Sequence, residues 1–134
     1  MPVFLDTNVL VSAFDRSDAE KRAAAQRLLA EESDFAISAQ VLSEFYVVTT
    51  KKLNPSLSHA EAVSAIDLLR NLPVVAVNDG LVATAIKTAH SSRISLWDAQ
   101  IVEAAVRAGC RVLLTEDLNA GQVISGVEVK DPFS

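Results

Sequence analysis

The sequence has a single cysteine and no long apolar run, and both absences narrow the class of protein. Cys110 cannot form a disulfide within the chain, which fits a cytoplasmic, reducing environment. No hydrophobic stretch approaches the roughly 18 residues needed to cross a bilayer, so we expect no membrane contact. The N-terminus also lacks a basic region leading into an apolar stretch, and we expect no signal peptide.

Positive charge is also scarce, with 12 basic against 17 acidic residues and a formal net charge of −5. Surfaces that bind nucleic acid are usually basic, because Lys and Arg displace counterions from the phosphates. The acidity therefore argues against tight binding of a long nucleic acid by this chain alone. If several carboxylates hold a divalent cation, however, much of the negative charge is local to that site.

Half of the residues are hydrophobic and 22% are charged, as in a globular domain with a core. Short apolar runs predict strands at residues 3–5, 35–37, 74–77, 112–114 and 127–129. Stretches that begin with capping residues predict helices at about 17–32, 38–52, 58–72, 78–91 and 95–108. Apolar strands alternating with helices indicate a parallel sheet covered on both faces. We predict one α/β domain over residues 1–134, with three layers and four to five strands.

Two acidic residues follow predicted strands. Asp6 comes directly after the strand at 3–5, and Asp117 lies three residues after Leu114. In open α/β sheets the functional crevice lies outside the carboxyl ends of the strands, so both side chains would face it. The alternative is that each Asp caps the next helix or forms a turn. Position alone leaves both interpretations open.

Asp98 lies at the centre of the apolar face of the helix predicted at 95–108. At about 100° per residue, its neighbours on the helical wheel are apolar, and the opposite face is polar. The first group is Ile101, Val102, Ala105 and Val106, and the second is Gln100, Glu103 and Arg107. The alternative is a capping box with Ser95, which would use the Asp98 side chain locally. A capping residue does not need to point into the core face.

Glu44 lies in a similar position on the helix predicted at 38–52. Its neighbours on the wheel are Val41, Phe45, Val47 and Val48. It is six residues from the predicted cap at Ser38, too far along the helix to cap it. A buried carboxylate normally neutralises, pairs or binds metal. No Arg or Lys stands three or four residues away, so a salt bridge would need a distant partner.

Carboxylates brought together need a compensating cation or shared protons. At about 4 Å and an effective dielectric near 20, each pair would repel by roughly 4 kcal/mol. Lys51, Arg93 and Arg111 are not obviously placed to neutralise four of them. Oxygen ligands select hard ions, so we expect Mg²⁺ or Mn²⁺ in place of Zn²⁺. His59, His90 and Cys110 stand apart from one another and are interpreted as surface or packing residues.

The motifs that contain these acids resemble those of a known family. Residues 4–10 (Phe-Leu-Asp-Thr-Asn-Val-Leu) resemble the opening motif of PIN-domain nucleases. Ser43-Glu44, Trp97-Asp98-Ala99 and residues 114–119 (Leu-Thr-Glu-Asp-Leu-Asn) match the family's later acidic motifs in order and spacing. The resemblance spans residues 3–132. The size and the C-terminal ending are most similar to VapC-type toxins of bacterial toxin–antitoxin pairs.

The resemblance implies a catalytic, metal-binding set of Asp6, Glu44, Asp98 and Asp117, with Mg²⁺ or Mn²⁺ as cofactor. It implies RNA cleavage that leaves a 5′-phosphate, with Asp6 and Asp98 as the central ligands. Residues implied to support the set by hydrogen bonds are Asn8 and Thr115. Asn119 stands where many relatives have a further Asp, so it adds no charge, and a second metal ion is in doubt.

The resemblance also implies partners, namely an RNA substrate, a second copy of the chain in a homodimer, and a cognate antitoxin that covers the acidic crevice. Single-stranded or looped RNA fits best, because its backbone can be splayed into a crevice. Residues considered for phosphate contacts are Lys51, Lys52, Lys87 and Arg93. For each of these, a solvated helix face is the alternative.

Two other functions fit the sequence less well. An aspartyl-nucleophile phosphatase requires a second acid two residues after the first, and that position is Asn8. A catalytically silent PIN-like module that only binds RNA or protein has no reason to keep four repelling carboxylates. The sequence therefore predicts a metal-dependent endoribonuclease of the toxin class.

Overall fold

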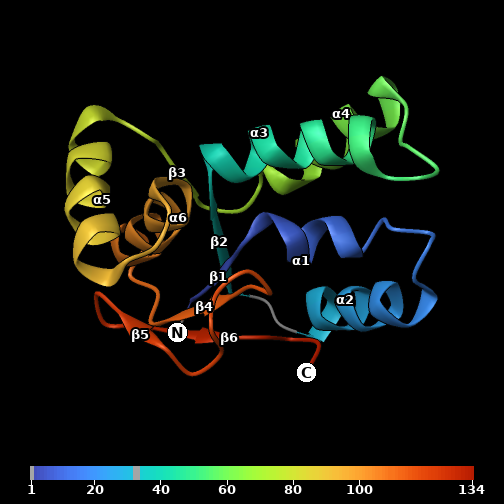
Figure 1. The fold of residues 1–134 in the computed structure, drawn as a ribbon. Coiled ribbons are helices and arrows are strands. Elements are labelled where there is room, and N and C mark those ends of the chain that lie inside the picture. The colour runs from blue at the N-terminus through green and yellow to red at the C-terminus, as the bar shows by residue number, and fades with distance from the viewer. Residues whose placement is uncertain (1, 32–33) are drawn as a thin grey trace.

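The computed structural model describes residues 2–31 and 34–134, which form a six-stranded sheet flanked by helices (Figure 1). The strand order is β3-β2-β1-β4-β6-β5. The strands are β1 (Val3–Leu5), β2 (Phe35–Ser38), β3 (Val74–Val75), β4 (Val112–Leu114), β5 (Val123–Ile124) and β6 (Val127–Lys130). All neighbours pair in parallel except β5, which pairs antiparallel with β6. The predicted α/β class and central parallel sheet are confirmed.

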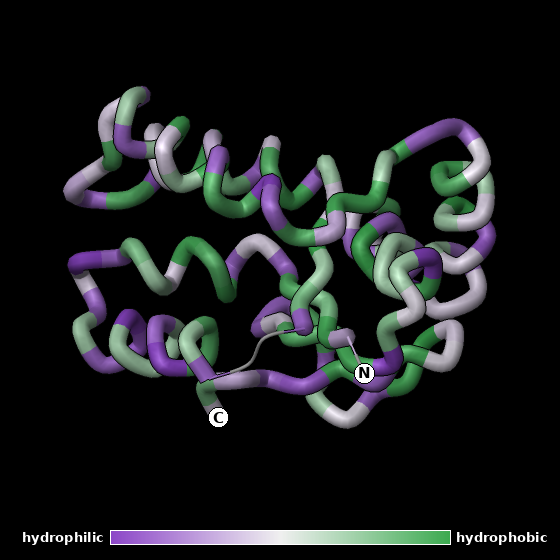
Figure 2. The backbone as a smooth tube through the Cα atoms, turned by 180° about the vertical axis from the view of Figure 1, so that it is seen from behind, coloured by the Kyte–Doolittle hydropathy of each residue, from purple (hydrophilic) through white to green (hydrophobic). Residues whose placement is uncertain are grey.

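Helices cover the sheet on both sides. They are α1 (Thr7–Ser12), α2 (Ala19–Glu31), α3 (Ala39–Val47), α4 (His59–Leu69), α5 (Asp79–Ser92) and α6 (Leu96–Arg107), with a π-helical turn η1 (Val48–Lys52) after α3. α5 and α6 lie together on one side of the strands, and α1 and α2 on the other (Figure 1). Seen from behind, hydrophobic stretches run through the centre of the molecule between these helices (Figure 2). No helix among the described residues is long and apolar enough to cross a membrane.

Several boundaries differ from the prediction. The helix predicted at 38–52 ends as α3 at Val47 and continues as η1, and β3 stops at Val75. Residue 32, the end of the helix predicted at about 17–32, lies outside the described residues. That helix is capped by Asp18, whose side chain accepts a hydrogen bond from the Lys21 N–H at 3.1 Å, while Ser17 bonds to Asp15. The capping box at Ser58 and Glu61 forms as predicted.

Two elements of the fold, α1 and β5, were not predicted from the sequence. Helix α1 is short and rich in β-branched residues, so it has no amphipathic period, and it begins because the Asp6 side chain caps it. Strand β5 joins β6 through Ser125 and Gly126, which have φ values of 51° and 79°. Positive φ at both central residues makes a tight hairpin turn that matches the twist of the strands.

The polar face predicted for α6 is wrong for two of its three residues. Gln100 and Glu103 are buried, with 5% and 6% of their surface exposed, because the helix is covered on this face too. Glu103 accepts hydrogen bonds from Thr88 on α5 and from Ser125 in the β5–β6 turn, both at 2.7 Å. α6 is therefore covered both by the sheet and by α5, and the buried Glu103 carboxylate links α5 and α6 to the β5–β6 turn.

Candidate active site

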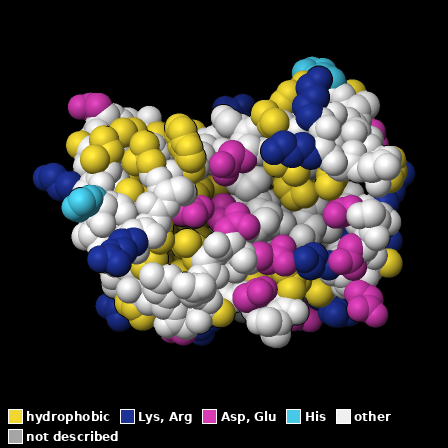
Figure 3. Space-filling view, in the orientation of Figure 1, with side chains coloured by type: hydrophobic (Ala, Val, Ile, Leu, Met, Phe, Trp, Pro, Cys, Tyr) yellow, Lys and Arg dark blue, Asp and Glu magenta, His cyan; other side chains and the backbone are white. Residues whose placement is uncertain are grey.

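A cleft of about 730 Å³ opens at the carboxyl ends of β1 and β4, between these strands and helices α1, α3 and α6. Its lining includes the four predicted acids, Asp6, Glu44, Asp98 and Asp117. Each comes from a different part of the chain: the end of β1, the middle of α3, the first turn of α6 and the loop after β4. Asp and Glu side chains gather across the middle of this face (Figure 3). The fold thus brings the predicted acids to one cleft.

Asp6 is the most buried of the four, with 5% of its surface exposed. Its carboxylate caps α1 by accepting from the Thr7 N–H at 2.7 Å, and it accepts from the Thr115 hydroxyl at 2.8 Å. Burial raises the pKa of Asp6 from 3.8 to about 6, against the lowering effect of the two hydrogen bonds. The negative charges of Asp117 and Glu44 raise it further. Asp6 therefore has the capping role and a place in the acidic cleft at once.

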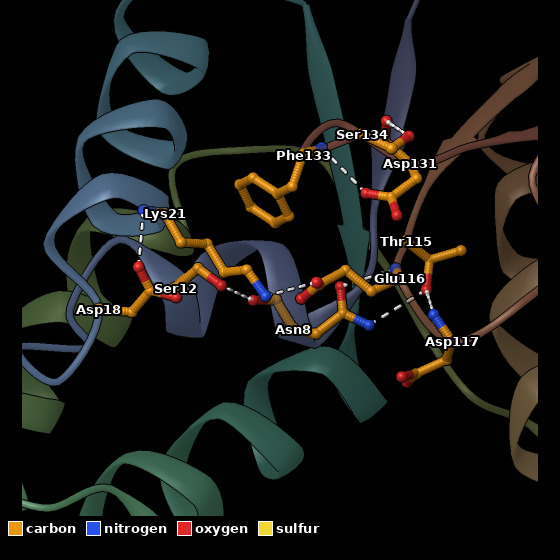
Figure 4. Close-up of polar contacts among 10 residues, drawn as sticks. All are labelled: Asn8, Ser12, Asp18, Lys21, Thr115, Glu116, Asp117, Asp131, Phe133 and Ser134. Carbon is orange, nitrogen blue, oxygen red and sulfur yellow. Dashed lines mark hydrogen bonds and ion pairs between the residues drawn. The ribbon is translucent and has the colours of Figure 1, made fainter.

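Thr115 connects three parts of the cleft and is fully buried. Its hydroxyl donates to Asp6 and accepts from the Asn8 side-chain amide at 3.1 Å and the Asp117 N–H at 3.0 Å. The side-chain oxygen Oδ1 of Asn8 in turn accepts from the Glu116 N–H at 3.3 Å (Figure 4). These bonds fix the loop that carries Asp117 against α1 and Asp6. The structure thus gives Asn8 and Thr115 hydrogen bonds of the supporting kind that the resemblance implied.

Glu44 is half-buried, so the prediction of a buried carboxylate is wrong. The apolar stripe of its helix is centred on Val41 and Phe45, and Val47, on the other side, is 48% exposed. Glu44 lies at the edge of that stripe and faces the cleft. Its carboxylate accepts from the Thr7 hydroxyl at 2.8 Å, a contact that the sequence analysis did not foresee.

Gln40 links the helix of Glu44 to the helix of Asp98. Its amide group donates to the Trp97 carbonyl at 3.2 Å and lies 3.5 Å from the second Glu44 oxygen. Its carbonyl oxygen accepts from Gln100 at 2.8 Å. Because Gln40 stands one helical turn before Glu44, the spacing could have suggested a side-chain pair. The contacts of Gln40 with Trp97 and Gln100 on α6 could not be predicted from any pattern in the sequence.

Asp98 is half-buried at the first turn of α6. Ser95 caps this helix by accepting from the Asp98 N–H at 3.0 Å. Burial raises the pKa of the Asp98 carboxyl, the Ser95 hydroxyl lowers it, and the charges of Asp117 and Glu44 raise it. Asp98 thus contacts the cap and faces the cleft, and the two interpretations of this residue are compatible.

Other predicted residues lie elsewhere. Asn119 and the basic residues Lys51, Lys87 and Arg93 are exposed and do not line the cleft, whereas Lys52 does. Four further charged residues that line it were not predicted as site residues, and two of them are Asp15 and Asp18. The other two are Lys21, from α2, and Glu116, beside Asp117. They form an ion pair with 2.6 Å between Lys21 Nζ and Glu116 Oε2. The two residues are 95 positions apart, so no local sequence pattern predicts this ion pair.

The donor set suits a hard divalent cation because every ligand is an oxygen. Among the described residues, however, no group of three or more His, Cys, Asp or Glu side chains is close enough to hold an ion as it stands. Mg²⁺ commonly keeps several waters and binds through one or two carboxylates. Asp117 and Glu44 lie near enough to both Asp6 and Asp98 to raise their pKa values, so a pair of carboxylates from this set fits that mode.

The fold and the cleft define a class: a three-layer α/β protein with an acidic, oxygen-only site at the carboxyl edge of a parallel sheet. Comparison with known proteins narrows this class to a family. The model of the PIN domain family matches residues 3–123, so the chain belongs to that family. No curated protein sequence matches the chain significantly.

Solved structures share the fold over nearly the whole chain. One is VapC20 of Mycobacterium tuberculosis, described as a sarcin–ricin loop cleaving toxin, with 24% identity, a TM-score of 0.71 and coverage of 94% of this chain and 98% of that one. A toxin–antitoxin complex from Klebsiella pneumoniae has 21% identity, a TM-score of 0.73 and 97% coverage of both chains. VapBC-1 from Haemophilus influenzae has 20% identity, a TM-score of 0.67 and full coverage of both. At these identities the likeness concerns the fold.

Proposed function

We propose that this protein is a metal-dependent endoribonuclease and the toxin of a toxin–antitoxin pair, acting in the cytoplasm. The observation that carries the proposal is the meeting of Asp6, Glu44, Asp98 and Asp117 in one cleft of a PIN domain. These four would be the catalytic carboxylates and would hold Mg²⁺ or Mn²⁺. The likeness in fold to VapC toxins supports the biological role.

The residues of the cleft would have distinct tasks in phosphodiester hydrolysis. A divalent metal supplies polarisation of the scissile phosphate and a lowered pKa of an attacking water. Asp6 and Asp98 would be its principal ligands, and Glu44 and Asp117 would orient the metal or the water. Thr115 and Asn8 would keep the Asp6 and Asp117 oxygens in fixed directions, as hydrogen-bond partners of metal ligands commonly do. The product would be RNA with a 5′-phosphate.

The partners follow from the same proposal. VapC20 is described as a sarcin–ricin loop cleaving toxin, which supports single-stranded or looped RNA as the substrate of this protein. Similar structures from Klebsiella pneumoniae, Salmonella typhimurium and Haemophilus influenzae are toxin–antitoxin assemblies. They support a cognate antitoxin as a partner. We propose that this antitoxin covers the cleft and that the toxin itself is a homodimer.

The catalytic test compares purified wild-type protein with Asp98→Asn on a mixed pool of structured RNAs. We expect wild type to cleave RNA with Mg²⁺ or Mn²⁺ and to stop when a chelator is added, whereas Asp98→Asn should lose most of the activity. Asp67→Asn is the matched control, because it removes the same charge from an exposed position on α4 outside the cleft. Equal cleavage by wild type and Asp98→Asn would show that this cleft is not the active site.

Metal binding is tested without any substrate. Calorimetric titration with Mn²⁺ should show binding to wild type and to Asp67→Asn, and much weaker binding to Asp6→Asn and Asp98→Asn. If wild type binds no Mn²⁺ at millimolar concentration, the metal-dependent mechanism is wrong and a catalytically silent PIN module becomes the better description. Sequencing of 5′-phosphorylated RNA ends that appear after induction in cells would identify the substrate.

A further inference from the structure

The acidic cleft is lined by positively charged side chains as well as by carboxylates. Lys21 and Lys52 are the two basic residues in its described lining, and Lys21 reaches across from α2 to the loop after β4. The Lys21 ammonium lies 2.6 Å from Glu116 and 5.3 Å from the centre of the Phe133 ring. In Figure 4 the Asp117 carboxylate lies apart from this ammonium, although Asp117 is the next residue after Glu116. Lys21 therefore pairs with the one acid of this loop that is outside the proposed catalytic set.

Lys21 is surrounded by negative charge. Its hydrogen bond to Glu116, together with the charges of Glu116, Asp18 and Asp131, raises the pKa of the ammonium above its usual value. Lys21 is therefore fully protonated at neutral pH. The two side chains of the ion pair are partly exposed, at 35% for Lys21 and 28% for Glu116. Ion pairs this exposed contribute little to stability, so a competing anion can replace Glu116 at small cost.

An RNA backbone that enters this cleft meets the four proposed catalytic carboxylates in its lining and needs a cation on the protein. We propose that Lys21 is a phosphate contact of the substrate: Glu116 holds the ammonium in the free protein, and an RNA phosphate takes the place of Glu116 when the substrate binds. This inference rests on the proposed ribonuclease function. Lys binds phosphate as a point charge, and the Phe133 ring would keep the ammonium at the rim through a cation–π contact.

A Lys21 that binds phosphate and a Lys21 that only stabilises the loop predict different effects of substitution on RNA binding. If the pair only fastened the loop to α2, then Lys21→Met and Glu116→Gln would break the same contact and change RNA binding in the same direction. If Lys21 binds phosphate, the two substitutions act in opposite directions. Lys21→Met removes the phosphate contact, whereas Glu116→Gln releases the ammonium from its competitor.

The experiment measures binding of a short single-stranded RNA in the presence of a chelator, so that cleavage does not interfere. We expect Lys21→Met to weaken binding on the order of tenfold. Its slope of log affinity against log salt should fall by about 0.7, the value for one lost phosphate contact to a single strand. Lys21→Arg should keep most of the binding. Arg27→Met is the matched control, because it removes one positive charge from an exposed position on the same helix.

Glu116→Gln should tighten binding, and the double variant shows whether this effect depends on Lys21. In a Lys21→Met background, Glu116→Gln should give clearly less tightening than in wild type. Steady-state cleavage should show the same direction, with Lys21→Met raising KM more than it lowers kcat. If Lys21→Met and wild type share one KM and one salt slope, or if both single variants shift binding in the same direction, the inference is wrong. These outcomes leave RNA cleavage by wild type intact, whereas loss of the proposed function would appear as a wild type that cleaves no RNA.

Discussion

Replacement of Asp6 by Asn should change how the stability of the protein depends on pH. The raised pKa of about 6, against the ordinary value of 3.8, means that the folded protein holds a proton on Asp6 over a range where the unfolded chain has released it. The folded state then binds more protons than the unfolded state, so stability falls as pH rises through that range. In Asp6→Asn this group no longer titrates, and its part of the pH dependence should disappear.

The size of the effect follows from the two pKa values. A shift of about two units corresponds to about 3 kcal/mol, at about 1.4 kcal/mol per unit. Between about pH 4.5 and 7.5, roughly 2 kcal/mol of this should be lost from wild type, because the unfolded group is already largely ionised at the lower pH. Asn also disturbs the hydrogen bond with Thr115, but that cost does not depend on pH. It cancels when the difference between variant and wild type is compared at the two pH values.

The assay is urea unfolding of both proteins across this pH range, without divalent metal. We expect the free energy of unfolding of the variant, relative to wild type, to rise by about 2 kcal/mol from the lowest to the highest pH. Parallel curves for the two proteins would refute the argument, because they would mean that Asp6 titrates alike in the folded and unfolded states. Added Mn²⁺ should flatten the wild-type curve if the proposed metal holds Asp6 ionised, and should leave the variant almost unchanged.

Three further substitutions test single contacts. Thr115→Val removes one hydroxyl that donates one hydrogen bond and accepts two, so we expect a loss of about 2–3 kcal/mol in urea unfolding and a lower kcat for RNA cleavage. Glu103→Ala leaves the hydroxyls of Thr88 and Ser125 without their acceptor and opens space in the core. We expect the free energy of unfolding to fall by about 2–4 kcal/mol. An unchanged denaturation midpoint would contradict this contact. Asn78→Ala removes the cap of α5 and should lower stability by about 1 kcal/mol, seen as a lower thermal midpoint at constant cleavage rate.

Much of the fold could be predicted because its signals are local. Buried strands such as β1 and β4 appear as short apolar runs, and the caps at Ser58, Asn78 and Ser95 mark helix starts one residue ahead. The elements that were missed have weak local signals. α1 is only six residues long and depends on the Asp6 side chain, and β5 is a two-residue edge strand held by pairing with β6.

The acids of the cleft could be predicted from the sequence, but the helix-face argument behind Asp98 and Glu44 was only partly correct. Asp98 and Glu44 were singled out because each stood on an apolar helix face, and both do line the cleft. The reason was only partly right, because both side chains are half-buried. Glu44 lies at the edge of its apolar stripe and accepts a hydrogen bond from Thr7. Periodicity reports the faces of one helix and says nothing about what packs against each face. For the same reason Glu103 was assigned to a polar face, although α5 and the β5–β6 turn bury it.

The sequence by itself determined the α/β class, the order of the four acids and the strand end at which Asp6 stands, because these depend on composition, period and position within single elements. Only the tertiary structure decided what each carboxylate contacts. The Thr115 hydroxyl joins Asp6 to a loop more than 100 residues away, and Lys21 pairs with Glu116 across 95 residues. Such contacts arise when separate elements pack side by side at the edge of the sheet, and no pattern along one stretch of chain contains that information.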